Sequence, residues 1–138
     1  SGTTRVEIVA TITGHGFNQD NQNCAEFCNH EHHYSMNGYS TAELHPIANS
    51  NDGCKQLVSE GVVANQYGSW PYGRAGWCPG QDVKQWRFDI SSWSDMSGIG
   101  VNNLHYEGLF NGQEYSPSDG VGNGNRNIHA EIWIVYYQ

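Results

Sequence analysis

The residues best suited to chemistry gather in one short segment, CAEFCNHEHHYSMNG at positions 24–38. Two cysteines and three histidines fall within ten consecutive positions of this segment. Imidazole nitrogens and thiolates are the ligands that zinc and copper take most readily in proteins. The segment therefore raises two questions: whether its histidines form a metal site, and whether its cysteines belong to that site.

The histidines are spaced so that two of them share one side of a strand. HEHHYSM, residues 30–36, has strand composition towards its end and is followed by an Asn-Gly turn signal. Because successive side chains of a strand point to opposite faces, His30 and His32 project together, roughly 6.5–7 Å apart at Cα, while His33 points away. Two imidazoles at that spacing can converge on one ion. A histidine-rich surface strand that holds no ion is the alternative.

A third ligand has to come from a neighbouring strand, and His129 is the best candidate. It lies near the start of the apolar strand expected at 127–137, on the face opposite Ile128 and Ala130. Three imidazoles suit copper or zinc, and composition does not separate the two metals. Three other histidines are interpreted as hydrogen-bonded core residues: His15, His45 and His105.

The whole chain is acidic and has the length of one ordinary domain. Its 138 residues suit a single domain, 1–138, with one core. The formal net charge of −8, with His neutral, argues against nucleic acid or an anionic membrane as the main partner, because both need a basic surface. No apolar run approaches the roughly 20 residues that a membrane-spanning helix needs.

The four cysteines indicate an oxidising compartment. An even number favours two disulfides and a secreted, periplasmic or extracellular location. No signal peptide is visible, so this location is inferred from the cysteines. A four-cysteine zinc site would usually draw on two close pairs, whereas only Cys24 and Cys28 are close in sequence. Cys24–Cys28 and Cys54–Cys78 are the favoured disulfides, and other pairings stay open from the spacing alone.

Alternating apolar residues predict an all-β fold. RVEIVATI, residues 5–12, places Val6, Ile8, Ala10 and Ile12 on one face of a half-buried strand. Further strands are expected at 30–36, 84–90, 104–110 and 127–137, with a long polar loop at 111–126. Since no segment carries a 3.6-residue apolar period, we expect an antiparallel β-sandwich or jelly roll.

Two motifs resemble a known family. CAEFC (24–28) with the residues that follow it, and GRAGWCPG (73–80), are similar to the carboxy-terminal domain of peptide:N-glycosidase F, the bacterial amidase that removes N-linked glycans. The likeness runs from about Val6 to Tyr136. It implies an eight-stranded antiparallel jelly roll, with the cysteines paired in the favoured way.

This resemblance also suggests two cleft residues. Glu26 matches a carboxylate that lines the amidase's active cleft, and Arg74 matches a substrate-contacting arginine. The principal catalytic Asp and a further Glu belong to the amidase's amino-terminal domain, which lies outside this sequence. Hydrolysis by this chain alone is therefore not expected. The structural alternatives are that Glu26 braces the tight cysteine loop and that Arg74 stacks between Tyr72 and Trp77.

The amidase domain is in turn similar in fold to the copper domains of peptidylglycine and dopamine monooxygenases. Their second domain carries an H-x-H-H strand that binds the oxygen-activating copper, and NHEHHY (29–34) looks like it. The resemblance implies His30 and His32 as copper ligands. The third ligand of that family is a Met seven residues before a Tyr-Tyr pair, and here His129 precedes Tyr136 by that spacing. The change from Met to His removes a soft thioether.

The sequence supports three functional hypotheses. The main one is a secreted mononuclear copper protein that, as an enzyme, would be a monooxygenase-like oxidoreductase rather than an amidase, and would draw electrons from an external reductant. One alternative is a non-catalytic copper carrier. The other is a glycan-binding or accessory domain related to the amidase. The sequence does not decide among a small molecule, a peptide and a glycan as substrate. The candidate sugar-stacking residues are Trp70, Tyr72 and Trp93.

Overall fold

A computed structural model describes residues 2–16, 25–45, 47, 52–64, 66–93, 101–115 and 126–138. Within these ranges the regular structure is mostly extended. The strands are β1 (Arg5–His15), β2 (His30–Met36), β3 (Tyr39–Glu43), β4 (Gln85–Asp89), β5 (His105–Phe110), β6 (Gln113–Glu114) and β7 (Asn127–Tyr137). Two short 3-10 helices are η1 (Gly53–Glu60) and η2 (Gln66–Gly68).

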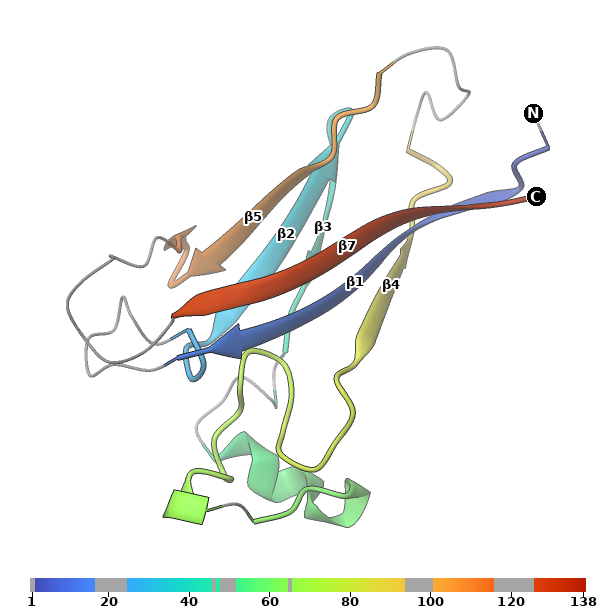
Figure 1. Ribbon diagram of the computed structural model, residues 1–138. Helices are drawn as coiled ribbons and strands as arrows, with labels where there is room; N and C mark the ends of the chain where they lie inside the picture. Colours follow the sequence, from blue (N-terminus) through green and yellow to red (C-terminus); the bar gives the residue numbers. More distant parts are fainter. Residues whose placement is uncertain are drawn as a thin grey trace.

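The strands form two antiparallel sheets that pack as layers (Figure 1). One sheet has the order β4-β1-β7 and the other the order β3-β2-β5-β6. The predicted all-β antiparallel sandwich is therefore confirmed. No helix in the described ranges is long and apolar enough to cross a membrane.

The apolar face predicted for β1 forms the centre of the core. The exposed fraction is at most 2 % for each of Val6, Ile8, Ala10 and Ile12. The other sheet supplies Tyr34 and Met36, and further core residues are Ile90, Trp93, Phe88, Ile132 and Ile134. Burying each large aliphatic side chain of this kind stabilises the fold by about 1.5–3 kcal/mol. Trp93, expected at the surface as a sugar platform, is 8 % exposed and belongs to this core.

Two strands, β3 and β6, were not expected, and both follow tight two-residue turns. The Asn-Gly signal at Asn37 and Gly38 is confirmed, with φ angles of 54° and 82°, and it returns the chain as β3. Asn111 and Gly112, with φ angles of 53° and 74°, make the matching turn into β6. The loop predicted at 111–126 is therefore structured at its start, and residues 116–125 lie outside the described ranges.

The helix η1 lies at the end of the sandwich where β1 ends and β4 begins (Figure 1). The predicted Cys54–Cys78 disulfide is confirmed, with a Cα–Cα distance of 5.6 Å, and it joins η1 to the segment before β4. Cys28 is also disulfide-bonded. The predicted Cys24–Cys28 pairing includes Cys24, which lies outside the described residues.

Gly14, near the end of β1, lies where two other segments contact the strand. A Cβ placed on Gly14 would overlap the carbonyl oxygen of Ala25 and come within 2.6 Å of the Cβ of Ala75. Nearby, the backbone N–H of Glu26 donates to the carbonyl of Gly16 at 3.1 Å. The missing side chain of Gly14 therefore allows the segment around Ala25 and the turn at Ala75 to pack on β1 together.

We expect Gly14→Ala to lower the free energy of unfolding by about 1–3 kcal/mol, the usual cost of forcing extra atoms into a packed site. Denaturant unfolding followed by tryptophan fluorescence measures the change. Gly2→Ala is the matched control, because a Cβ there meets nothing within 4 Å. Equal stability of the two variants would contradict the close packing at Gly14.

Candidate functional site

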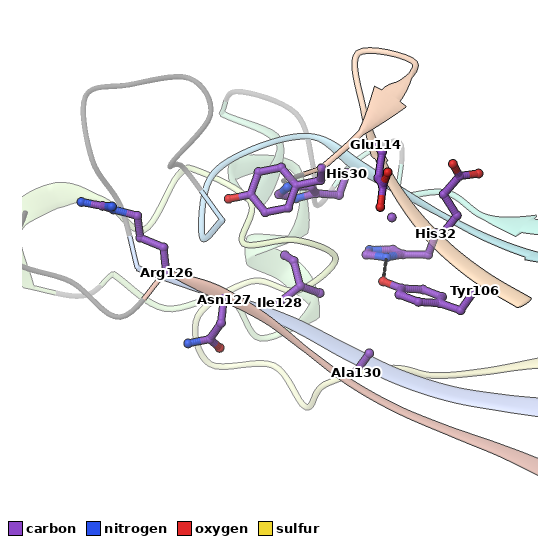
Figure 2. A pocket seen from close by; sticks show the side chains of 11 residues that line it. His30, His32, Tyr106, Glu114, Arg126, Asn127, Ile128 and Ala130 are labelled. Carbon is purple, nitrogen blue, oxygen red and sulfur yellow. Dashed lines mark hydrogen bonds between the residues drawn. The ribbon is translucent and has the colours of Figure 1, made fainter. Parts of the chain in front are cut away.

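His30 and His32 line a cavity of about 430 Å³ between the sheets (Figure 2). Both side chains point inward from β2 and are 1 % and 0 % exposed. Their ring centroids are 6.3 Å apart. The expectation that these two histidines share a face is confirmed, and that face is the inner one.

His129 does not join this pair. On β7 the side chains of Ile128 and Ala130 line the cavity (Figure 2), whereas His129, between them, is exposed and pairs with Thr13 on the neighbouring strand. Strand alternation accounts for this, because placing the isoleucines of β7 in the core turns the residues between them outward. Among the described residues, no group of three or more His, Cys, Asp or Glu side chains is arranged to hold a metal ion. The described residues therefore do not fit the expected three-histidine copper or zinc centre.

Burial keeps the two cavity histidines neutral. It lowers the pKa of His30 to about 4 and that of His32 to about 3, where neighbouring imidazoles, first that of His45, lower it further. Nδ1 of His32 shares a hydrogen bond of 2.9 Å with the hydroxyl of Tyr106. Burial, with a smaller effect of the Glu43 carboxylate, raises the pKa of Tyr106 to about 12. The inner end of the cavity therefore presents uncharged hydrogen-bonding groups at neutral pH.

A second group of buried polar residues continues from His32. The hydroxyl of Tyr34 donates to Oε2 of Glu43 at 3.1 Å, and Nε2 of His45 lies 2.9 Å from Oε1 of the same carboxylate. The rings of His32 and His45 are 5.8 Å apart and nearly perpendicular. Burial, with a smaller effect of Glu43, raises the pKa of Tyr34. The expected burial of His45 in the core is therefore confirmed.

The same expectation is wrong for His15 and His105, which are both exposed. His15 ends β1, where its Nε2 shares a hydrogen bond of 2.8 Å with the hydroxyl of Thr13. His105 begins β5. Both lie at strand ends, where the sheet offers little cover.

Glu26 and Arg74, the two residues expected to line a cleft, lie against each other. Nε of Arg74 donates to Oε1 of Glu26 at 2.8 Å, and Nη2 donates to the hydroxyl of Ser69 at 3.0 Å. Arg74 is 4 % exposed, whereas the side chain of Glu26 keeps 29 % of its surface exposed. A buried guanidinium thus holds a carboxylate that is still accessible from solvent.

A tight turn positions Arg74. The backbone N–H of Arg74 donates to the carbonyl of Trp77 at 2.9 Å, and a longer hydrogen bond of 3.4 Å runs the other way. Ala75 and Gly76 between them have φ angles of 46° and 105°, the left-handed pair of a type I′ turn. Gly76 has a second constraint, because a Cβ there would lie 2.6–2.8 Å from the ring of His45. The string RAGW in the second motif is therefore a two-residue hairpin turn.

Aromatic rings surround the ion pair. The guanidinium carbon of Arg74 lies 5.2 Å from the ring centroid of Phe27 and 5.8 Å from that of Trp77. Phe27 in turn packs edge-on against the exposed ring of Tyr72 at 6.0 Å. The expected stacking of Arg74 is seen on Trp77, while Nη1 donates to the carbonyl of Tyr72 at 3.5 Å. The name Glu26–Arg74 site is used below for six residues: Glu26, Phe27, Ser69, Tyr72, Arg74 and Trp77. Nothing in the sequence indicated the roles of Ser69 and Phe27.

The comparisons with known proteins agree with these motifs. The family model described as peptide-N-glycosidase F, C terminal, matches residues 1–135. The chain belongs to this family. A solved structure, that of PNGase F, a glycosylasparaginase from Flavobacterium meningosepticum, superposes with a TM-score of 0.53 at 24 % identity, covering 94 % of this chain and 39 % of that one. That likeness shows a shared fold, and this member of the family spans about two fifths of the length of the solved chain. No curated protein sequence matches significantly.

We expect the free energy of unfolding to fall as the pH is lowered from about 6.5 towards 4. Unfolded histidine titrates near 6.5, whereas folded His30 and His32 titrate at about 4 and about 3, so the unfolded chain binds more protons in this window. The stabilisation is complete above about pH 6.5, and each histidine contributes a slope of at most about 1.4 kcal/mol per pH unit.

Urea unfolding at a series of pH values measures this slope. His32→Gln should reduce this slope by up to about 1.4 kcal/mol per pH unit, and by more than the control substitution His105→Gln, which replaces an exposed imidazole. Identical slopes for His32→Gln and the unsubstituted chain would contradict the burial of a neutral imidazole at this position.

Proposed function

We propose that this chain is a glycan-binding domain that recognises the junction between an asparagine side chain and its first sugar. The observation that carries the proposal is the ion pair of Glu26 and Arg74, joined at 2.8 Å with the guanidinium buried and the carboxylate accessible. The chemistry of this pair, its aromatic surroundings and the family of the chain all favour the same ligand.

The carboxylate of Glu26 offers strong acceptor oxygens. An ionised carboxylate accepts hydrogen bonds from amide N–H and hydroxyl groups, and these bonds are stronger than those between neutral groups. A glycosylated asparagine presents both kinds of donor within one small unit. Since Arg74, itself held by its hydrogen bond to Ser69, fixes the carboxylate on one side, a ligand would meet an acceptor that is already oriented.

The aromatic rings beside the pair suit the apolar faces of a sugar. Tyr72 is exposed, Trp77 is half-buried, and Phe27 packs edge-on against Tyr72. Aromatic side chains give a large apolar contact area with fixed geometry. The solved relative is described as a glycosylasparaginase, so the ligand class inferred from the site agrees with the class named for that protein.

Binding, rather than hydrolysis, is the activity that we assign to this chain. Amide hydrolysis needs placed proton-transfer groups, and the Glu26–Arg74 site supplies one carboxylate. The copper hypotheses are not carried forward, because His129 lies on the outer face of its sheet. The disulfide Cys54–Cys78 supports an extracytoplasmic location, since disulfides persist in oxidising compartments.

Calorimetric titration with an asparagine-linked glycopeptide, and with the same peptide lacking its sugar, tests the proposal. The chain should bind the glycopeptide and not the bare peptide. Glu26→Gln should weaken binding roughly 10- to 100-fold, because it removes the charge from an acceptor of several hydrogen bonds. Arg74→Lys should also weaken binding, since an ammonium group cannot reproduce the contacts of the guanidinium to Glu26 and Ser69.

Glu31→Gln is the matched control for Glu26→Gln. Glu31 is an exposed carboxylate on β2 that pairs with His33 at 3.0 Å and is not one of the residues of the Glu26–Arg74 site, so its loss should leave binding unchanged. Circular dichroism verifies that each variant is folded. Equal affinity for the glycopeptide and the bare peptide would overturn the proposal, and so would an unchanged affinity of Glu26→Gln.

A further inference from the structure

A second, larger groove begins at Trp77. Its volume is about 720 Å³, within the usual range for small-molecule sites. Its lining includes His45, Trp77, Gln81, Asp82, Lys84 and Trp86. Trp77 also lies beside the guanidinium of Arg74, so this one residue contributes both to the Glu26–Arg74 site and to the groove.

Trp86 gives the groove a fixed aromatic wall. The buried ring of His45 packs edge-on against Trp86, with 4.8 Å between the ring centroids, and this contact holds the indole from one side. The ammonium of Lys84 lies 4.2 Å from the centre of the indole ring. A cation takes this position because the face of the ring is electron-rich. The polarised C–H groups of a sugar are attracted to such a face in the same way, and the exposed side chain of Lys84 can give way to them.

The rim of the groove carries polar groups of both charges, with one more carboxylate than ammonium. Glu60 and Asp82 bring two carboxylates and Lys84 brings one ammonium, and all three are exposed. The side-chain amide of Gln81 donates to the backbone carbonyl of Glu60 at 3.4 Å, which places a planar donor and acceptor at the edge. The two carboxylates disfavour an anionic ligand. Indole walls with a hydrogen-bonding rim suit a neutral ligand rich in hydroxyl groups.

We propose that this groove binds further, neutral sugar units of the glycan whose first unit is held at the Glu26–Arg74 site, an inference that rests on the proposed function. The path between the two sites is short, because Arg74 and Trp77 are hydrogen-bonded partners across a two-residue turn. A sugar chain that leaves Glu26 along this turn passes Trp77 and reaches the indole of Trp86. The groove would thus select for the length and branching of the glycan, while Glu26 and Arg74 select for its linkage to asparagine.

NMR titration with a neutral high-mannose oligosaccharide, released from its peptide, tests the groove directly. The indole N–H signals of Trp77 and Trp86 should shift on addition of the oligosaccharide. Trp86→Ala should weaken binding of the oligosaccharide about ten-fold, and Gln81→Ala about three-fold. Gln113→Ala, on the exposed strand β6, is the matched control for Gln81→Ala and should bind like the unsubstituted chain.

Gln81→Ala keeps the test decisive if Trp86→Ala fails to fold, because it removes a smaller, polar side chain from the lining of the groove. Unchanged oligosaccharide affinity in folded Trp86→Ala or in Gln81→Ala overturns the inference. So does binding of a bare apolar peptide in the groove without binding of the oligosaccharide.

The failure of this inference can be told apart from the failure of the proposed function. In one outcome, the free oligosaccharide binds and shifts the Trp86 signal, while Glu26→Gln leaves the affinity for the glycopeptide unchanged. The groove is then supported and the linkage site is ruled out. In the other outcome, Glu26→Gln weakens glycopeptide binding, while Trp86→Ala and Gln81→Ala leave the affinity for the oligosaccharide unchanged. The linkage site is then supported and the groove is ruled out.

Discussion

The close approach of three chain segments at Gly14 is the constraint on which the candidate site depends. A strand residue without a side chain lets the backbone at Ala25 and the turn at Ala75 contact β1 at one point. The residues that follow and precede these contacts, Glu26 and Arg74, are 48 positions apart in sequence and meet at 2.8 Å. The packing of Ala25 and Ala75 against Gly14 therefore holds the ion pair in place. The disulfide Cys54–Cys78 fixes the segment that carries the turn.

Two groups of polar residues differ in how they are buried. His30 and His32 sit in a cavity where burial keeps them neutral, and the hydrogen bond to Tyr106 orients one of them. Glu43 and His45 continue this buried group towards the groove at Trp86. The Glu26–Arg74 site differs, because there the cation is buried and the anion remains accessible. Only the second arrangement offers a charged, oriented acceptor to a ligand, which is why it carries the functional proposal.

Local patterns predicted the sheets well, and they predicted the site in part. Alternation over Val6–Ile12 located the core strand, and the Asn-Gly signal located the first hairpin, because both depend on neighbouring residues. Strand β3 carries no apolar alternation and is formed by pairing with β2, so its sequence gave no signal. The spacing to Tyr136 suggested His129 as a ligand, but spacing does not tell which face of β7 packs against the core. The isoleucines of β7 pack there, so His129 faces outward. The contact between Glu26 and Arg74 is a long-range one, and the family resemblance suggested both as cleft residues without indicating that they pair.

The proposed function requires that a glycosylated asparagine bind at Glu26, beside the buried Arg74. The side-chain Nε–H signal of Arg74 in an NMR spectrum reports on this contact, because that N–H donates to Glu26. We expect an asparagine-linked glycopeptide to shift this signal in a saturable way, whereas the bare peptide should leave it in place. Saturable binding of the glycopeptide with no change in the Arg74 signal, and with shifts confined to the cavity of His30 and His32, would contradict the proposed function.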